Sequence, residues 1–283
     1  MTPLADDDAP EDVELYDLEI RLLLEAVYQR YQHDFRDYAV SSVRRRMRQA
    51  MTHFRCAHLG ELQHLLLSDA SAFEQSLQYF TVQLSEMFRD PGYFRALRDD
   101  VVPVLRTYPS LKVWVAGCSC GEEAWSLAIL LAEEGLLERT ILYATDINPA
   151  ALRTAETGVY PLDRIAAFSR NYQAAGGRGS LSDHCSTGYN GALLDRRLKK
   201  RMVFADHSLA TDSVFSEVHL VSCRNVLIYF NRELQDRAIS LFREALVHRG
   251  FLGLGSKETL QFGNHAHAFE PWVAAERIFR KRS

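Results

Sequence analysis

The sequence predicts an α/β fold with a doubly wound sheet, preceded by a small all-helical domain. From residue 113 onward, short apolar runs alternate with segments of helical periodicity, as in βα units. Before that, apolar residues recur only at helical spacing. The first unit, VWVAGCSCGEE at 113–123, has the order of strand, tight turn and helix. With 283 residues, 47% of them hydrophobic, the chain is long enough to bury a sizeable core.

The N-terminal part is expected to be helical near residues 15–31, 40–55, 60–68, 71–82 and 92–106. The first thirteen residues contain five acidic side chains and two prolines, with little to bury, so we expect 1–13 to be a disordered acidic tail. A helical domain over 14–90 and an α/β domain over 91–283 follow from these patterns.

Four arginines lie on one predicted helix of an otherwise acidic chain: Arg44, Arg45, Arg46 and Arg48. A solvated helix face and a docking surface for an acidic partner both explain such a cluster. The residues alone leave the two interpretations open.

Polar residues follow four predicted strands at the points where the strands end. The segments that carry them are the turn at 117–123, Asp146 after 141–145, 206–209 (Asp, His, Ser, Leu) after 202–205, and 224–226 (Arg, Asn, Val) after 218–223. Because the carboxyl ends of parallel strands share one edge of a sheet, these groups are expected to meet in one crevice. Such a crevice suits a nucleoside.

Acidic residues narrow the choice of ligand. Glu122 and Glu123 open the helix after the first turn and would repel a phosphate there, so a neutral or cationic nucleoside fits better. Ser119 and Glu122 have the spacing of a capping box, which leaves Glu123 as the better ligand candidate. Asp146 lies 25 positions beyond Gly121, about the spacing at which nucleotide folds bind ribose hydroxyls. The alternative is an N-cap, which Asn148 fits better.

The polar segment 166–199 interrupts the alternation and is expected to form an inserted subdomain. Alternation resumes beyond it, and runs at 251–255 and 277–281 are expected to close the sheet.

Composition excludes several classes of protein. A net charge of −4 argues against nucleic-acid binding. The longest apolar runs are too short to span a membrane, and the acidic N-terminus is unlike a signal peptide, so we expect a cytoplasmic protein without membrane insertion. Five scattered cysteines do not suggest disulfides, and Cys118 and Cys120 have no second pair nearby to complete a zinc site, so no metal is expected.

In its sequence motifs the chain resembles the CheR family of chemoreceptor glutamate methyltransferases. The matching segments are GCSCGEEAWSLAILL (117–131), ATDINPAALRTAETGVY (144–160), CRNVLIYF (223–230), GFLGLGSKETL (250–260) and, more weakly, TVQLSEMFRD (81–90). The resemblance implies a helical domain joined to a Rossmann-like methyltransferase domain with an inserted β-subdomain. It also implies S-adenosylmethionine as cofactor and S-adenosylhomocysteine as product.

The resemblance further implies roles for individual residues. Those expected at the cofactor are Gln83, Ser85, Arg89, Ala116, Gly117, Glu123, Asp146, Ser208, Leu209, Asn225 and Val226. Arg89 and Tyr229 are implied as the catalytic residues near the transferred methyl group. The arginine-bearing helix is implied to meet the acidic methylation region in the cytoplasmic part of a chemoreceptor.

Departures from the family pattern leave alternatives open. Gln83, Ser85 and Met87 replace the usual Asn, Thr and Phe, and Ser208 stands where Asn is common, which changes the reach of these side chains. These changes and the segment 166–199 allow a methyltransferase with a different acceptor. A further alternative is a non-catalytic S-adenosylmethionine-binding signalling module, against which the retention of Arg89 and Tyr229 argues. An acceptor glutamate, with a pKa near ~4.3, is already an anionic nucleophile. Positioning by Arg89, with Tyr229 either donating a hydrogen bond or only packing, is then the main task.

Overall fold

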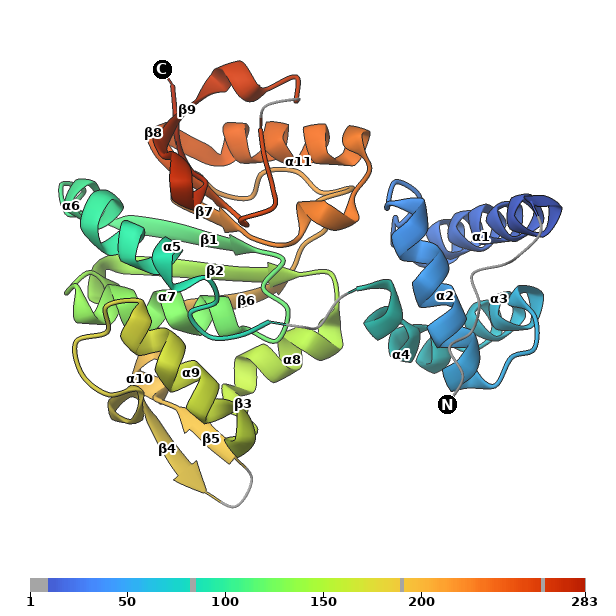
Figure 1. Ribbon diagram of the computed structural model, residues 1–283, viewed down its shortest axis with the longest axis horizontal. Coiled ribbons are helices and arrows are strands. Elements are labelled where there is room, and N and C mark those ends of the chain that lie inside the picture. Colours follow the sequence, from blue (N-terminus) through green and yellow to red (C-terminus); the bar gives the residue numbers. More distant parts are fainter. Residues whose placement is uncertain (1–9, 82–84, 189–190, 261–262, 283) are drawn as a thin grey trace. The chain divides into compact units, whose positions relative to one another are not determined.

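A computed structural model describes residues 10–81, 85–188, 191–260 and 263–282 of the chain. The chain divides into two compact units (Figure 1). The first runs to Val82 and also includes Tyr229–Asn231, whereas the second comprises Gln83–Ile228 and Arg232–Ser283.

The described residues of the first unit form four helices: α1 (Pro10–Tyr31), α2 (Val40–Phe54), α3 (Leu59–Ser68) and α4 (Ala70–Phe80). Their apolar faces bury side chains such as Leu23, Met47 and Leu62, each 0% exposed. Since α1 begins at Pro10, residues 10–13 are helical and not part of a disordered tail, whereas the rest of the expected tail, 1–9, lies outside the described residues. Proline suits the first turn of a helix, where its missing N–H has no partner in any case.

The second unit is built on a seven-stranded sheet in the order β6-β2-β1-β7-β8-β10-β9. The strands are β1 (Leu111–Ala116), β2 (Thr140–Asp146), β6 (Met202–Asp206), β7 (Val218–Cys223), β8 (Leu246–Leu254), β9 (Phe269–Val273) and β10 (Ile278–Lys281). Five strands are parallel, while β10 runs antiparallel to β8 and β9, so the sheet is mixed. The strand order reverses at β1, which pairs with both β2 and β7. In open α/β sheets, ligands bind at such a switch point, beyond the carboxyl ends of the strands.

Helices α7 (Glu122–Glu133), α8 (Pro149–Thr157) and α11 (Arg232–Ala245) connect or follow these strands. The helix expected over 92–106 is interrupted: α5 (Pro91–Ala96) and α6 (Val102–Leu105) flank a π-helical turn (Leu97–Val101). Strand β9 was not predicted. It lies at the sheet edge and contains Pro271, and proline in a sheet is confined mainly to edge strands.

The inserted segment forms a second, three-stranded antiparallel sheet in the order β3-β5-β4. Its strands are β3 (Val159–Tyr160), β4 (Cys185–Gly188) and β5 (Gly191–Leu194), and its helices are α9 (Leu162–Ala174) and α10 (Arg196–Lys199). The structured insertion therefore begins at β3, several residues before the expected start at 166. Helix α9 buries Phe168 and Tyr172, which are 1% and 0% exposed.

Candidate functional site

The turn after β1 requires a glycine. Ala116 ends the strand and is buried, and Gly117 follows with a φ of +72°, a conformation that side chains disfavour. The N–H of Gly117 donates to the carbonyl of Thr145 at 2.8 Å. A Cβ atom at position 117 would lie 2.5 Å from Cγ2 of Val226. The turn after β1 and the loop after β7 therefore touch, as their expected shared edge requires.

Asp146 is buried at the end of β2, with 8% of its surface exposed. One carboxylate oxygen accepts the N–H of Ser119 at 2.8 Å and the other that of Asn148 at 2.9 Å. Burial raises the pKa of Asp146, and these backbone donors act against that rise. Asn148 caps α8 through the N–H groups of Ala150 and Ala151, as predicted. Asp146 is thus not the cap, and carboxylate oxygens can accept further hydrogen bonds.

Glu123 has structural partners that the sequence did not reveal. Its carboxylate accepts hydrogen bonds from Ser222 Oγ at 2.6 Å and from Arg224 Nη1 at 3.1 Å. The Arg224 side chain is 1% exposed and also pairs with Asp90 at 2.8 Å. Arg224 therefore joins the start of α7 to the end of β7. A ligand that binds the Glu123 carboxylate would share that carboxylate with Ser222 and Arg224.

Glu122 does not form the expected capping box. The N-cap of α7 is Gly121, in a left-handed conformation with no side-chain cap, so Glu122 is the first residue of the helix. Its side chain is 0% exposed and pairs with Arg164 of α9 at 2.8 Å. Burial raises the pKa of Glu122. Glu122 therefore links α7 to helix α9 of the inserted segment. This role is structural, as expected, but it is an ion pair and not a helix cap.

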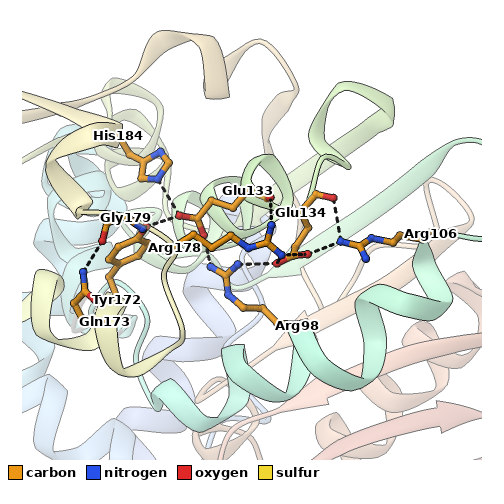
Figure 2. Close-up of polar contacts among 9 residues, drawn as sticks. All are labelled: Arg98, Arg106, Glu133, Glu134, Tyr172, Gln173, Arg178, Gly179 and His184. Carbon is orange, nitrogen blue, oxygen red and sulfur yellow. Dashed lines mark hydrogen bonds and ion pairs between the residues drawn. The ribbon is translucent and has the colours of Figure 1, made fainter.

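The opposite end of α7 is held by a charged network (Figure 2). Glu134 contacts Arg98 at 3.0 Å, Arg106 at 2.6 Å and Arg178 at 2.8 Å. Glu133 accepts from Arg98, Tyr172 and His184. Burial favours a higher pKa for Glu133, but hydrogen bonds from His184, Tyr172 and Arg98 outweigh it and lower the pKa to about 2. Fixed at both ends, α7 holds Glu123 in a defined position.

The segment that carries Arg89 is fastened to the same sheet edge. Phe88 and Asp90 on either side have φ values of +52° and +54°. The N–H of Phe88 donates to Ser126 Oγ of α7 at 2.9 Å, and Arg224 Nη2 donates to the carbonyl of Arg89 at 3.0 Å. Arg89 itself is half-buried.

Of the two polar replacements before Arg89, Gln83 and Ser85, the structure describes only Ser85. The carbonyl of Ser85 accepts a hydrogen bond from Arg164. Gln83 lies outside the described residues.

One buried acid at this edge of the sheet that sequence reasoning missed is Glu258. Its carboxylate, 4% exposed, accepts four backbone N–H groups: Gly255 at 2.6 Å, Asn225 at 3.0 Å, Val226 at 2.9 Å and Ile228 at 3.3 Å. Asn225 has a φ of +59°, which these bonds hold in place. Burial raises the pKa of Glu258, and the backbone donors oppose that rise. The available signal was a single acid within the apolar, glycine-rich block 250–260.

Ser208 and Leu209 follow β6, whose last residue, Asp206, is in register with Asp146. The N–H of Ser208 donates to Asp212 at 2.9 Å, and Leu209 is 7% exposed. Together with the groups described above, they lie at the carboxyl ends of β1, β2, β6 and β7. The glycine turn, the Asp146 carboxylate and the apolar side chains of Val226 and Leu209 fit a nucleoside with a positive charge better than a phosphate.

The predicted residues of the first unit separate into different environments. Arg44 pairs with Asp17 of α1, and Arg45 and Arg48 are exposed. Arg46 is only 3% exposed, so its assignment to a docking surface is corrected. Tyr229 belongs to this unit, and the guanidinium of Arg46 lies over its ring.

Within the described ranges, no cluster of three or more His, Cys, Asp or Glu side chains is arranged to hold a metal ion. No helix formed by those residues combines the length and the apolar character needed to cross a membrane.

Comparisons with known proteins agree with this geometry. Residues 83–276 match the family model described as CheR methyltransferase, SAM binding domain, and residues 18–81 match CheR methyltransferase, all-alpha domain. The chain is 56% identical over 265 residues to a putative methyltransferase Cher3 of Pseudomonas putida, covering 94% of this chain and 97% of the relative. It is 29% identical over 225 residues to a chemotaxis protein methyltransferase of Listeria monocytogenes, covering 79% and 83%.

Proposed function

The chain belongs to the CheR methyltransferase family, with S-adenosylmethionine as its cofactor, and on this basis we propose that it methylates glutamate side chains of a chemoreceptor. The observation that carries the proposal is the attachment of the Arg89 segment to the cofactor edge of the sheet. Arg224 contacts both the carbonyl of Arg89 and the carboxylate of Glu123. A cationic residue is thereby anchored beside the strand ends that suit the cofactor.

The chemistry needs positioning more than proton transfer. When bound, S-adenosylmethionine would supply a methyl group on a sulfonium sulfur. A carboxylate oxygen of the acceptor forms the O–CH3 bond as the S–CH3 bond breaks, which gives the methyl ester and leaves S-adenosylhomocysteine. An acceptor glutamate, with a pKa of ~4.3, is ionised at neutral pH, so no general base is required. Arg89 orients one carboxylate oxygen through charge-assisted hydrogen bonds and leaves the other oxygen to attack. Tyr229 either donates a second hydrogen bond or packs against the acceptor.

A chemoreceptor is proposed as the acceptor for two reasons. The relative from Listeria monocytogenes is named a chemotaxis protein methyltransferase, and so is one from Pseudomonas aeruginosa, 30% identical over 195 residues, 65% of this chain and 66% of the relative. The exposed Arg45 and Arg48 on α2 also provide positive charge for an acidic methylation region. The alternative, a methyltransferase with a different acceptor protein, is allowed by the changed segment 81–89 and by the segment 166–199.

The proposal is tested with methyl-labelled S-adenosylmethionine and cytoplasmic fragments of the host's chemoreceptors. Label on receptor glutamates that alkali releases is expected, because carboxyl methyl esters hydrolyse and N-methyl groups do not. Absence of transfer to any receptor, with cofactor binding intact by calorimetry, would exclude chemoreceptors as acceptors.

The role of Arg89 is tested in the same assay. Arg89→Ala is expected to reduce turnover about 100-fold, because the acceptor loses its orienting cation. The matched control is Arg95→Ala on the exposed face of α5, which should leave turnover unchanged. Unchanged turnover in Arg89→Ala would refute the role.

A further inference from the structure

A buried arginine in the first unit has no acidic partner among the residues that the structure describes. Arg46 of α2 is 3% exposed, and the ionisable groups that act on it are Tyr229, Tyr38 and the neighbouring Arg45. Burial lowers the pKa of Arg46. Burying a guanidinium without a carboxylate is costly, and an apolar side chain of similar volume would fill the same space at no such cost. The arginine therefore calls for an explanation other than packing.

Its contacts provide one. Nη1 of Arg46 donates to the carbonyl of Phe80, whereas Nη2 has no hydrogen-bond partner among the residues that the structure describes. The guanidinium carbon lies 4.6 Å from the centre of the Tyr229 ring. The negative face of an aromatic ring attracts a cation, and the attraction is strongest where water is excluded. Tyr229 is thus the group that compensates the buried charge.

Both contacts lie where the chain leaves or enters the first unit. Phe80 ends α4, nine residues before Arg89, and Tyr229 opens the short segment that returns to this unit. The backbone of that segment is held separately, because Ala39 donates to the carbonyl of Tyr229 and Asn231 donates to that of Asp37, each at 2.8 Å. The main-chain bonds place the segment, which leaves the Arg46 guanidinium to orient the Tyr229 ring.

We propose that Arg46 is a positioning residue for methyl transfer and that it acts through Tyr229. The guanidinium holds the ring in one orientation and ties it to the end of α4. This inference rests on the proposed function, since it assumes that Tyr229 contributes to the transfer step. It differs from a docking role, in which Arg46 would affect acceptor binding, and from a role in stability alone.

Steady-state kinetics distinguish these roles. Arg46→Met is expected to lower kcat about tenfold, with the affinity for S-adenosylmethionine within twofold of wild type and Tm unchanged or raised. Arg46→Lys keeps the charge and should recover part of the loss. In a Tyr229→Ala background, Arg46→Met should change kcat less than twofold, because the group it acts on is gone. The control is Arg30→Met, which removes an exposed arginine lying over Tyr31 and should leave kcat unchanged.

Other results would overturn the inference. An equal loss of kcat with and without the Tyr229 ring would show that Arg46 acts independently of it. A raised KM for the receptor fragment at unchanged kcat would identify a docking residue, and a fall in Tm and kcat together that Arg46→Lys does not recover would identify a structural one.

A measurement without turnover separates this inference from the proposed function. In protein labelled with 3-fluorotyrosine, the ¹⁹F resonance of Tyr229 is the one of 12 that Tyr229→Phe removes. Arg46→Met should shift or broaden this resonance, because the ring loses the cation on its face. If receptor methylation fails but the resonance responds, the proposed function is wrong and the contact stands. An unchanged resonance would refute the contact.

Discussion

Replacing Glu258 by glutamine should weaken both cofactor binding and folding, although no predicted cofactor ligand is altered. The carboxylate accepts the N–H groups of Asn225 and Gly255 on one oxygen and those of Val226 and Ile228 on the other. A glutamine side chain keeps one acceptor oxygen and presents an NH₂ group where the second oxygen was. Two backbone donors then lose their acceptor and face another donor.

The size of the effect follows from that count. Each buried donor left without a partner costs about 1–3 kcal/mol, so two cost about 2–6 kcal/mol. Part of this cost lowers the free energy of unfolding, and Tm should fall by about 5 °C or more. The remaining cost is avoided where the backbone at Asn225 and Val226 moves away from its wild-type position, which disturbs the cofactor site. We therefore expect affinity for S-adenosylhomocysteine to fall at least about tenfold, which is 1.4 kcal/mol.

Calorimetric titration with S-adenosylhomocysteine and thermal unfolding measure the two parts. Glu258→Asp should also bind weakly, because its shorter side chain cannot reach all four donors. The control is Glu233→Gln at the exposed start of α11, where the same chemical change removes no buried acceptor. Wild-type affinity and Tm in Glu258→Gln would refute the reasoning.

Three further predictions concern the same unit. Gly117→Ala should cost about 1–2 kcal/mol of strain and weaken cofactor binding, because its Cβ would lie 2.5 Å from Val226; an unchanged dissociation constant would contradict this. Arg164→Ala should destabilise the fold by about 3–5 kcal/mol, because it leaves the buried Glu122 carboxylate unpaired, and chemical denaturation measures the loss. The lowered pKa of Glu133 means that its contribution to stability is complete above the ordinary pKa of 4.5 and is lost as the pH falls towards about 2. Glu133→Gln should therefore flatten the dependence of Tm on pH in that range, and a slope identical to that of wild type would exclude the effect.

Arg46 shows what helical spacing predicts about a buried side chain and what depends on tertiary contacts. It stands three residues after Val43 and four before Ala50, both buried, so helical spacing puts it beside the apolar stripe of α2. Arg44, Arg45 and Arg48 lie on other parts of the helix surface. The spacing was therefore informative, but a guanidinium enters a core only where partners exist, and its partners here are 34 and 183 residues away in sequence.

The sequence by itself determined the elements whose cause is local. Hydrophobic periodicity predicted the helices of the first unit and most strands of the seven-stranded sheet, but not α9 or α10 of the inserted segment. The alternation of strands and helices predicted that polar groups would gather at one sheet edge. Asn148 was predicted as a cap because a cap bonds the next turn of its own helix. Tertiary structure alone decided which charges are buried and with what: Glu122 with Arg164, Glu123 with Arg224, and Glu258 with the loop at Asn225. The physical reason is that the partners of a buried charge are supplied by packing between segments tens of residues apart, and local periodicity carries no information about which segments those are.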